Sequence, residues 1–63
     1  MPFVTIRILE GHPQPRKDEI ARRVTQAISE VAHLPKDAVW VVFEDVKPTD
    51  WFVGEVAVAQ RRG

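Results

Sequence analysis

Cysteine is absent from the sequence, so neither disulfide bonds nor thiolate-rich zinc sites can stabilise the fold. The two histidines, His12 and His33, are too few for a metal cage, and no cluster of His, Asp and Glu has ligand spacing. A chain of 63 residues buries only about 60% of its unfolded surface on folding. Oligomerisation is the remedy that remains for such a small chain. We therefore expect a single domain over residues 1–63 that associates with further copies of itself.

An excess of charge of one sign is also lacking, because nine basic residues balance nine acidic ones. A nucleic-acid-binding module would show a basic stripe with aromatic residues interleaved, so we expect no nucleic-acid partner. No apolar run approaches the roughly 20 residues of a membrane span, and no signal-peptide pattern is present. We expect no membrane partner and a cytoplasmic location.

The stretch from Phe3 to Leu9 mixes β-branched and apolar residues, which predicts a β-strand close to the start of the chain. Side chains alternate between the two faces of a strand. Pro2 therefore belongs to a wholly apolar face, whereas Arg7 points to the opposite face.

A helix is predicted from Pro15 to about His33 and Leu34. Proline suits the first position of a helix, and Pro35 cannot continue one. An apolar stripe of helical period runs along this segment: Ile20, Val24, Ala27, Ile28 and Val31.

The near-continuous apolar run from Ala38 to Glu44 predicts a second strand, buried on both faces as parallel strands are. Strand, helix and strand form a right-handed βαβ unit, so the fold class is α/β. After Trp51-Phe52-Val53-Gly54, the closing segment from Glu55 to Ala59 predicts a hairpin arm or an extra strand, and residues 60–63 are expected to be a flexible tail. One helix leaves one face of a two-stranded sheet bare, so the apolar faces need other copies of the chain.

The dipeptide Met1-Pro2 carries the main chemical hypothesis. Methionine aminopeptidases remove a methionine that precedes a small residue, so we expect Met1 to be removed. Pro2 would then carry a secondary amine, which is a base, whereas a prolyl nitrogen inside a chain is not. An α-amino group titrates at a pKa of about 7.7–8.0, and burial in an apolar pocket lowers that pKa. The alternative from these two residues alone is a frayed and inert terminus.

Several features occur in a characteristic order: Pro2 after Met1, a strand ending in Ile8-Leu9-Glu10-Gly11, a helix with Val24-Thr25-Gln26-Ala27-Ile28, a second apolar strand, and Trp51 shortly before Gly54. From Pro2 to about Gly54 the sequence resembles the short 4-oxalocrotonate tautomerase family of the tautomerase superfamily. The resemblance implies a βαβ protomer, paired into dimers that assemble as a homo-hexamer. It also implies that the Pro2 amine is the catalytic acid–base and that no cofactor takes part.

The resemblance further implies four substrate-binding positions: Leu9, His12, Trp40 and Trp51. The arginine that the family usually carries after the Glu-Gly pair is His12 here, and its second arginine is Trp40. Those arginines bind the carboxylates of a dicarboxylate substrate, and neither replacement offers a bidentate fork. Trp51 fits the position of an aromatic wall beside the proline.

The sequence contains four further arginines that bear on this site. Arg7 is not recruited, because strand alternation points it away from Pro2. Three of them could extend into the pocket of a neighbouring copy: Arg16, Arg61 and Arg62.

Three functions follow from these residues. The first is a cofactor-independent keto–enol tautomerase with Pro2 as its base, acting on small 2-hydroxydienoate or phenylenolpyruvate-like carboxylates. The second is a hydratase or dehalogenase of the same superfamily, in which Asp50 or Glu44 would activate water. The third is a non-catalytic oligomeric relative that binds small molecules and has lost its arginines.

Overall fold

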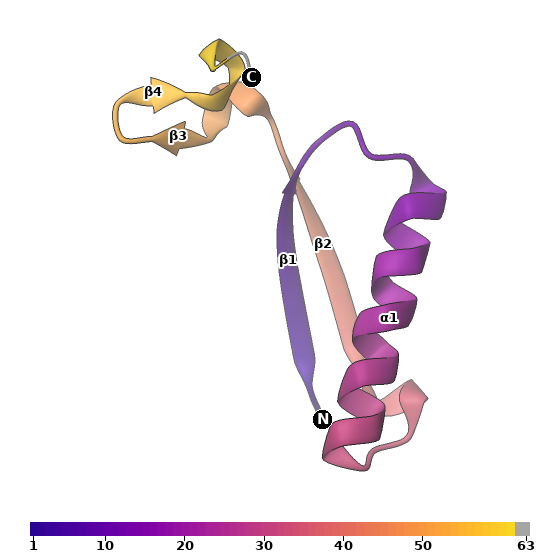
Figure 1. The fold of residues 1–63 in the computed structure, drawn as a ribbon. Coiled ribbons are helices and arrows are strands. Elements are labelled where there is room, and N and C mark those ends of the chain that lie inside the picture. The colour runs from indigo at the N-terminus through magenta and orange to yellow at the C-terminus, as the bar shows by residue number, and fades with distance from the viewer. Residues whose placement is uncertain (62–63) are drawn as a thin grey trace.

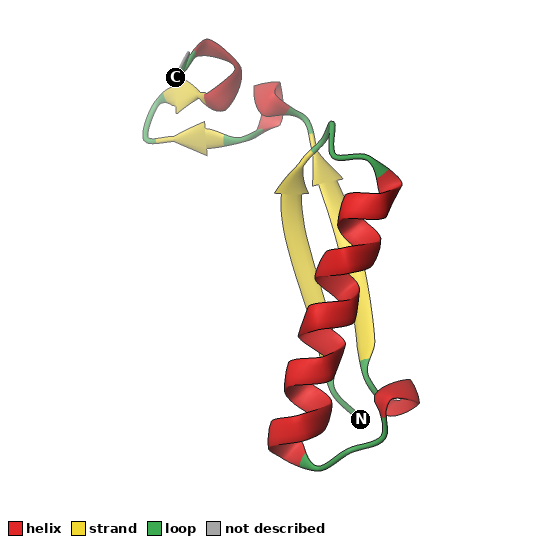
Figure 2. Cartoon of the chain, turned by 45° about the vertical axis from the view of Figure 1, so that its right-hand side comes forward, coloured by secondary structure: helices red, strands yellow, loops and turns green. Residues whose placement is uncertain are grey.

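Two parallel strands and one helix make up most of the computed structural model, which describes residues 1–61 (Figure 1). The strands are β1 (Phe3–Leu9) and β2 (Trp40–Val46), and α1 (Gln14–Ala32) connects them. Figures 1 and 2 show α1 against one face of the sheet, whereas the other face is bare. The predicted βαβ unit of an α/β fold is confirmed.

The first strand has the predicted bounds, and its register against the second is continuous from Phe3↔Trp40 to Leu9↔Val46. Exposure alternates along β1 from Phe3 to Ile8, as strand geometry requires. Val4, Ile6 and Ile8 are partly buried, and Arg7 lies on the exposed face.

The second strand begins two residues later than predicted and is not buried on both faces. Lys36–Ala38 forms a 3-10 turn, closed by the bond from the Val39 N–H to the Lys36 carbonyl at 3.1 Å. Because of this turn, the strand begins only at Trp40. On the bare face Trp40 is 52% exposed and Val42 is 39% exposed, because within one chain nothing covers them.

The helix starts one residue before Pro15 and ends at Ala32, just short of the predicted end. His33 adopts the left-handed conformation with φ 58° and donates its N–H to the Ser29 carbonyl. The helix therefore ends at this cap, two residues before Pro35. Part of the predicted apolar stripe is not buried. Ile20, Val24 and Ile28 are partly buried, whereas Ala27 is exposed and Val31 is 81% exposed.

The chain after β2 forms a small hairpin at the carboxyl end of the sheet (Figure 1). A 3-10 turn, η2 (Pro48–Asp50), leads through Trp51 to β3 (Phe52–Val53), which pairs antiparallel with β4 (Val56–Ala57). Gly54 makes the turn with φ 65°, a conformation that suits glycine. Of the two structures left open for this segment, the hairpin is therefore the one present.

The last described residues form a further 3-10 turn, η3 (Val58–Gln60). Gln60, predicted to begin the flexible tail, is thus the end of a turn that folds back. The bond from the Val58 N–H to the Trp51 carbonyl, at 2.7 Å, ties this turn to the start of the hairpin. Arg61 follows and donates its N–H to the Val58 carbonyl at 3.0 Å, and the last two residues of the predicted tail, 62–63, lie outside the described residues.

A single copy of this chain buries little of its surface. The radius of gyration is 14.7 Å, against about 10.6 Å for a compact domain of this length. The accessible surface is 4994 Å², against about 4,100 Å² for a folded monomer of this mass. Within residues 1–61 Ala57 is the one buried hydrophobic residue, at 9% exposure. The apolar side chains of the bare face therefore have no core to enter within one chain.

Candidate functional site

Pro2 lies at the amino end of the sheet and is held there by the strand ladder. Its carbonyl accepts a hydrogen bond from the Trp40 N–H at 3.0 Å, and the residue is partly buried. Strand alternation places Pro2 on the face that α1 covers, with Val4 and Ile6. The position is therefore fixed by the fold, unlike that of a frayed terminus.

Trp40 lies at the same end of the sheet but on the bare face. Its ring packs against Phe3, with 6.1 Å between the ring centroids and 39° between the ring planes. Phe3 is 61% exposed and Trp40 is 52% exposed. The two rings form an uncovered aromatic patch at the same end of the sheet as Pro2, on the opposite face.

Leu9, His12 and Trp51 lie at the other end of the sheet. Seven residue steps separate Pro2 from Leu9, and at about 3.3 Å per step an extended strand spans on the order of 20 Å. Figure 1 shows the N-terminus and the C-terminal hairpin at opposite ends of the strands. Within one chain, therefore, Trp51 does not lie beside Pro2, and the predicted site residues form two separate groups.

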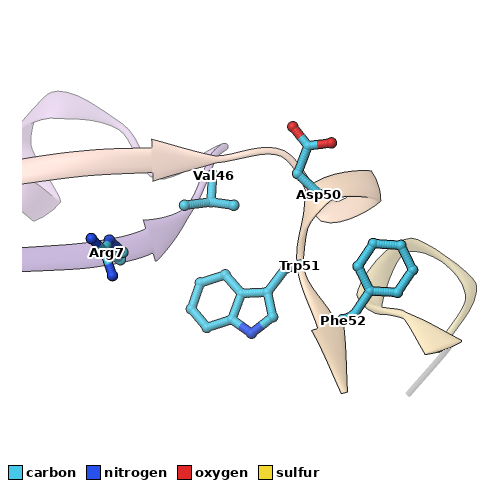
Figure 3. Close-up of a pocket in the computed structure, with 5 residues that line it drawn as sticks. All are labelled: Arg7, Val46, Asp50, Trp51 and Phe52. Atoms are coloured by element: carbon cyan, nitrogen blue, oxygen red, sulfur yellow. The ribbon is translucent and has the colours of Figure 1, made fainter. Parts of the chain in front are cut away.

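A recess of about 320 Å³ opens at this carboxyl end, lined by Arg7, Val46, Asp50, Trp51 and Phe52 (Figure 3). In Figure 3 the Trp51 indole extends toward Val46 and Arg7, whereas the Asp50 carboxylate points away from the ring. The Arg7 Nε donates to Glu44 Oε1 at 2.9 Å across the two strands. Glu44 is thus engaged in an ion pair, and the recess combines an aromatic wall with one cation.

His12 lies between β1 and α1, and a glycine sets its direction. Gly11 has φ 114°, which a residue with a side chain rarely adopts, and it turns the chain out of the strand. His12 follows, partly buried, and its Nδ1 is 3.1 Å from an Arg16 terminal nitrogen, Nη1. An imidazole and a guanidinium are therefore in contact at the start of α1.

Residues 1–61 contain no group of three or more His, Cys, Asp or Glu side chains that could hold a metal ion. In the same range, no helix has the length and hydrophobicity that a membrane crossing requires.

Comparison with known proteins decides the family. The family described as "Tautomerase enzyme" matches residues 2–61. This chain belongs to the tautomerase family. A probable tautomerase of Listeria monocytogenes is 41% identical over 56 residues, which cover 89% of this chain and 92% of the relative.

Solved structures of the tautomerase family have the same fold as this chain. One from a study of the 4-oxalocrotonate tautomerase isozymes of Methylibium petroleiphilum superimposes with a TM-score of 0.87 at 34% identity, covering 92% of this chain and 94% of that one. A heterohexamer 4-oxalocrotonate tautomerase of Chloroflexus aurantiacus gives a TM-score of 0.91 at 32% identity, with 98% and 100% covered. The resemblance found in the sequence is thereby confirmed.

Two residues lie near the predicted site residues although the sequence did not predict them as neighbours. Arg7 shares the recess with Trp51 although it points away from Pro2, because the recess lies on the bare face at the other end of the strand. Arg16 contacts His12 within the same chain, whereas the sequence suggested at most a role in a neighbouring copy. The spacing of four residues between His12 and Arg16 was the available signal.

Proposed function

We propose that this member of the tautomerase family is a cofactor-independent keto–enol tautomerase whose base is the amine of Pro2, freed by removal of Met1. The observation that carries the proposal is the fixed, partly buried position of Pro2, whose carbonyl is bonded to the Trp40 N–H at 3.0 Å. Catalysis by proton transfer needs a base held at one place relative to its substrate. Family membership over residues 2–61 supports the assignment.

The reaction is an isomerisation that needs no second reactant. The unprotonated amine takes the proton of the enol hydroxyl, and the oxygen becomes a carbonyl as the double bond shifts. The same amine, now protonated, returns the proton to a carbon of the conjugated system. Such positioned acid–base catalysis contributes about 10²–10⁴-fold in rate.

A complete site requires a second copy of the chain, because Pro2 and the group of Leu9, His12 and Trp51 lie at opposite ends of the sheet. The free edge of β1 offers a way to join them. If two copies pair β1 edges antiparallel about the strand midpoint, Ile6, then Pro2 of one copy comes beside the Leu9 end of the other.

This pairing also puts Pro2 and the start of the other copy's α1 on the same face of the sheet. Antiparallel strands in one sheet are related by a two-fold axis perpendicular to it, so both helices lie on the same face. Pro2 is on that face, and so is the start of the other copy's α1, where His12 and Arg16 meet. Trp51 lies at the same end of the other copy but lines the recess on the bare face. The bare faces remain exposed in such a dimer, and their aromatic and aliphatic residues would be covered by assembly of three dimers into a hexamer.

The substrate class follows from the charged groups at the site. Position 40 carries an indole rather than a cation, so only one end of the substrate would meet a positive charge. We therefore assign small 2-hydroxydienoate or phenylenolpyruvate-like monocarboxylates with an apolar tail, for which Trp51, at the same end of the paired copy as His12, provides apolar surface.

The assignment predicts that the processed protein ketonises phenylenolpyruvate with a kcat/KM at least about ten-fold higher than that for the dicarboxylate 2-hydroxymuconate. One missing charge-assisted hydrogen bond is worth about 1.5–3 kcal/mol, which is roughly ten-fold or more. Steady-state absorbance assays of both compounds give the ratio. Absence of turnover with either compound, or a preference for the dicarboxylate, would contradict the assignment.

A hydratase remains the second candidate because Asp50 lines the recess beside Trp51. Mass spectrometry of the products separates the two reactions. A tautomerase gives a product of unchanged mass, and a hydratase adds the mass of one water.

A further inference from the structure

The contact between His12 and Arg16 fixes the proton on the imidazole. Arg16 Nη1 is 3.1 Å from His12 Nδ1. A guanidinium has five N–H donors and no acceptor, so Nδ1 must accept the bond. The imidazole in this pair is therefore neutral and carries its proton on Nε2. Its second nitrogen is a hydrogen-bond donor that is directed away from Arg16.

Arg16 also differs from the other cations of this region in lacking a carboxylate partner among the described residues. Lys17 Nζ is 2.8 Å from an Asp45 carboxylate oxygen, which joins α1 to β2. Arg7 is paired with Glu44.

Further along α1, Glu19 forms ion pairs with two arginines, Arg22 and Arg23. Hydrogen bonds from Arg22 and then Arg23 lower the pKa of Glu19 to about 2, so this carboxylate is charged at neutral pH and both arginines are matched. The charge of Arg16, in contrast, is not neutralised by any ion pair within residues 1–61.

The first turn of α1 contains no acidic residue that could form an ion pair with Arg16. That turn runs from Gln14 to Lys17. The nearest acid along the helix is Asp18, whose Oδ1 accepts a hydrogen bond from the Gln14 side-chain amide at 2.9 Å. The positive end of the helix dipole lies at the same place and adds to the field of Arg16.

We propose that Arg16 and His12 together bind the substrate carboxylate that is presented to Pro2 of the paired copy. This inference rests on the proposed tautomerase function and names the residues that recognise its substrate class. One Arg16 N–H donates a hydrogen bond to the imidazole. The remaining N–H groups of the guanidinium and the His12 Nε2–H can then donate hydrogen bonds to the oxygens of a carboxylate. Arg16 supplies the charge, and His12 supplies a donor of fixed tautomer.

The pair therefore selects for a carboxylate over an uncharged group of the same shape. Cinnamate and cinnamamide provide a matched pair of probes, since they share the apolar tail and differ in charge. Their binding can be followed by NMR titration of backbone amides, without any turnover.

Arg16→Gln is expected to weaken cinnamate binding by about ten-fold and to leave cinnamamide binding unchanged, because a hydrogen bond to a charged group is lost. Glutamine is a good helix former, so an exposed substitution in α1 should not disturb the fold. Arg23→Gln is the matched control: it removes the same charge from the same helix, and Glu19 keeps its bond to Arg22. It should leave both probes unaffected.

A second readout concerns the imidazole itself. The ¹⁵N shifts of His12 in the wild type should report a proton on Nε2, and Arg16→Gln should bring the ring to a mixture of tautomers. Arg16→Lys, which keeps the charge in a single compact group, should restore part of the affinity for cinnamate.

Three results would overturn the inference: no cinnamate binding to the wild type, an equal loss for cinnamate and cinnamamide, or a loss in Arg23→Gln as large as in Arg16→Gln. None of them depends on Pro2. If Pro2→Ala keeps full activity while Arg16→Gln behaves as stated, then the tautomerase mechanism fails and the carboxylate site stands. If Pro2→Ala abolishes turnover and Arg16→Gln changes nothing, the reverse holds.

Discussion

Replacing Pro2 with alanine is expected to lower kcat/KM for phenylenolpyruvate by at least about 10²-fold, the lower range for a positioned acid–base. Methionine before alanine is also removed, so the variant still has an α-amine at the same place in the sequence. What it loses is the ring that fixes the nitrogen, since a primary amine on alanine rotates freely about its bond to Cα. The measurement is a steady-state assay at neutral pH.

The matched control for this variant is Pro35→Ala, which makes the same chemical change at an exposed position after α1. Its activity should stay within a few-fold of the wild type. A Pro2→Ala protein that is folded and as active as Pro35→Ala would show that the Pro2 amine is not the base.

Retention of Met1 is expected to abolish activity, with a loss greater than that of Pro2→Ala. In the retained form the Pro2 nitrogen belongs to a peptide bond, whose resonance removes its basicity. A chain of 63 residues is within reach of chemical synthesis, so the forms with and without Met1 can be made side by side. Intact mass identifies each form, and the phenylenolpyruvate assay compares them.

Circular dichroism and light scattering provide the control, because both forms should have the same helix content and the same assembled mass. Equal turnover by the two synthetic forms would refute catalysis by a free prolyl amine, whatever the outcome at other positions.

Much of the fold was predictable because its signals are local. The alternation from Phe3 to Leu9 gave the bounds of β1 correctly. The start of β2 was not predictable to the residue, since it depends on whether Lys36–Ala38 closes a 3-10 turn. The exposure of Trp40 and Val42 could not be foreseen either, because an apolar run looks alike whether its cover comes from the same chain or from another copy.

The site was less predictable than the fold, because alternation gives the face of a strand but not which residues meet at its end. The sequence suggests Pro2 and Trp51 as neighbours only through the family resemblance. In one chain they lie at opposite ends of the sheet, because Pro2 precedes β1 and Trp51 follows the parallel strand β2. The contact between His12 and Arg16 crosses the start of a helix. The spacing of four residues brings these two side chains together only because Gly11, with φ 114°, turns the chain toward α1, and this turn was not predicted.

The assembled site is the central claim, and mixing two inactive variants tests it most directly. One variant is Pro2→Ala, and the other combines His12→Ala with Trp51→Ala, so each lacks one end of the site. The two are unfolded together, refolded as mixed oligomers and assayed with phenylenolpyruvate. If Pro2 and the group of His12 and Trp51 come from different copies, random mixing leaves about a quarter of the sites with both parts intact. The account predicts recovery of about that fraction of wild-type activity, whereas activity no higher than the average of the two separately refolded variants would contradict it.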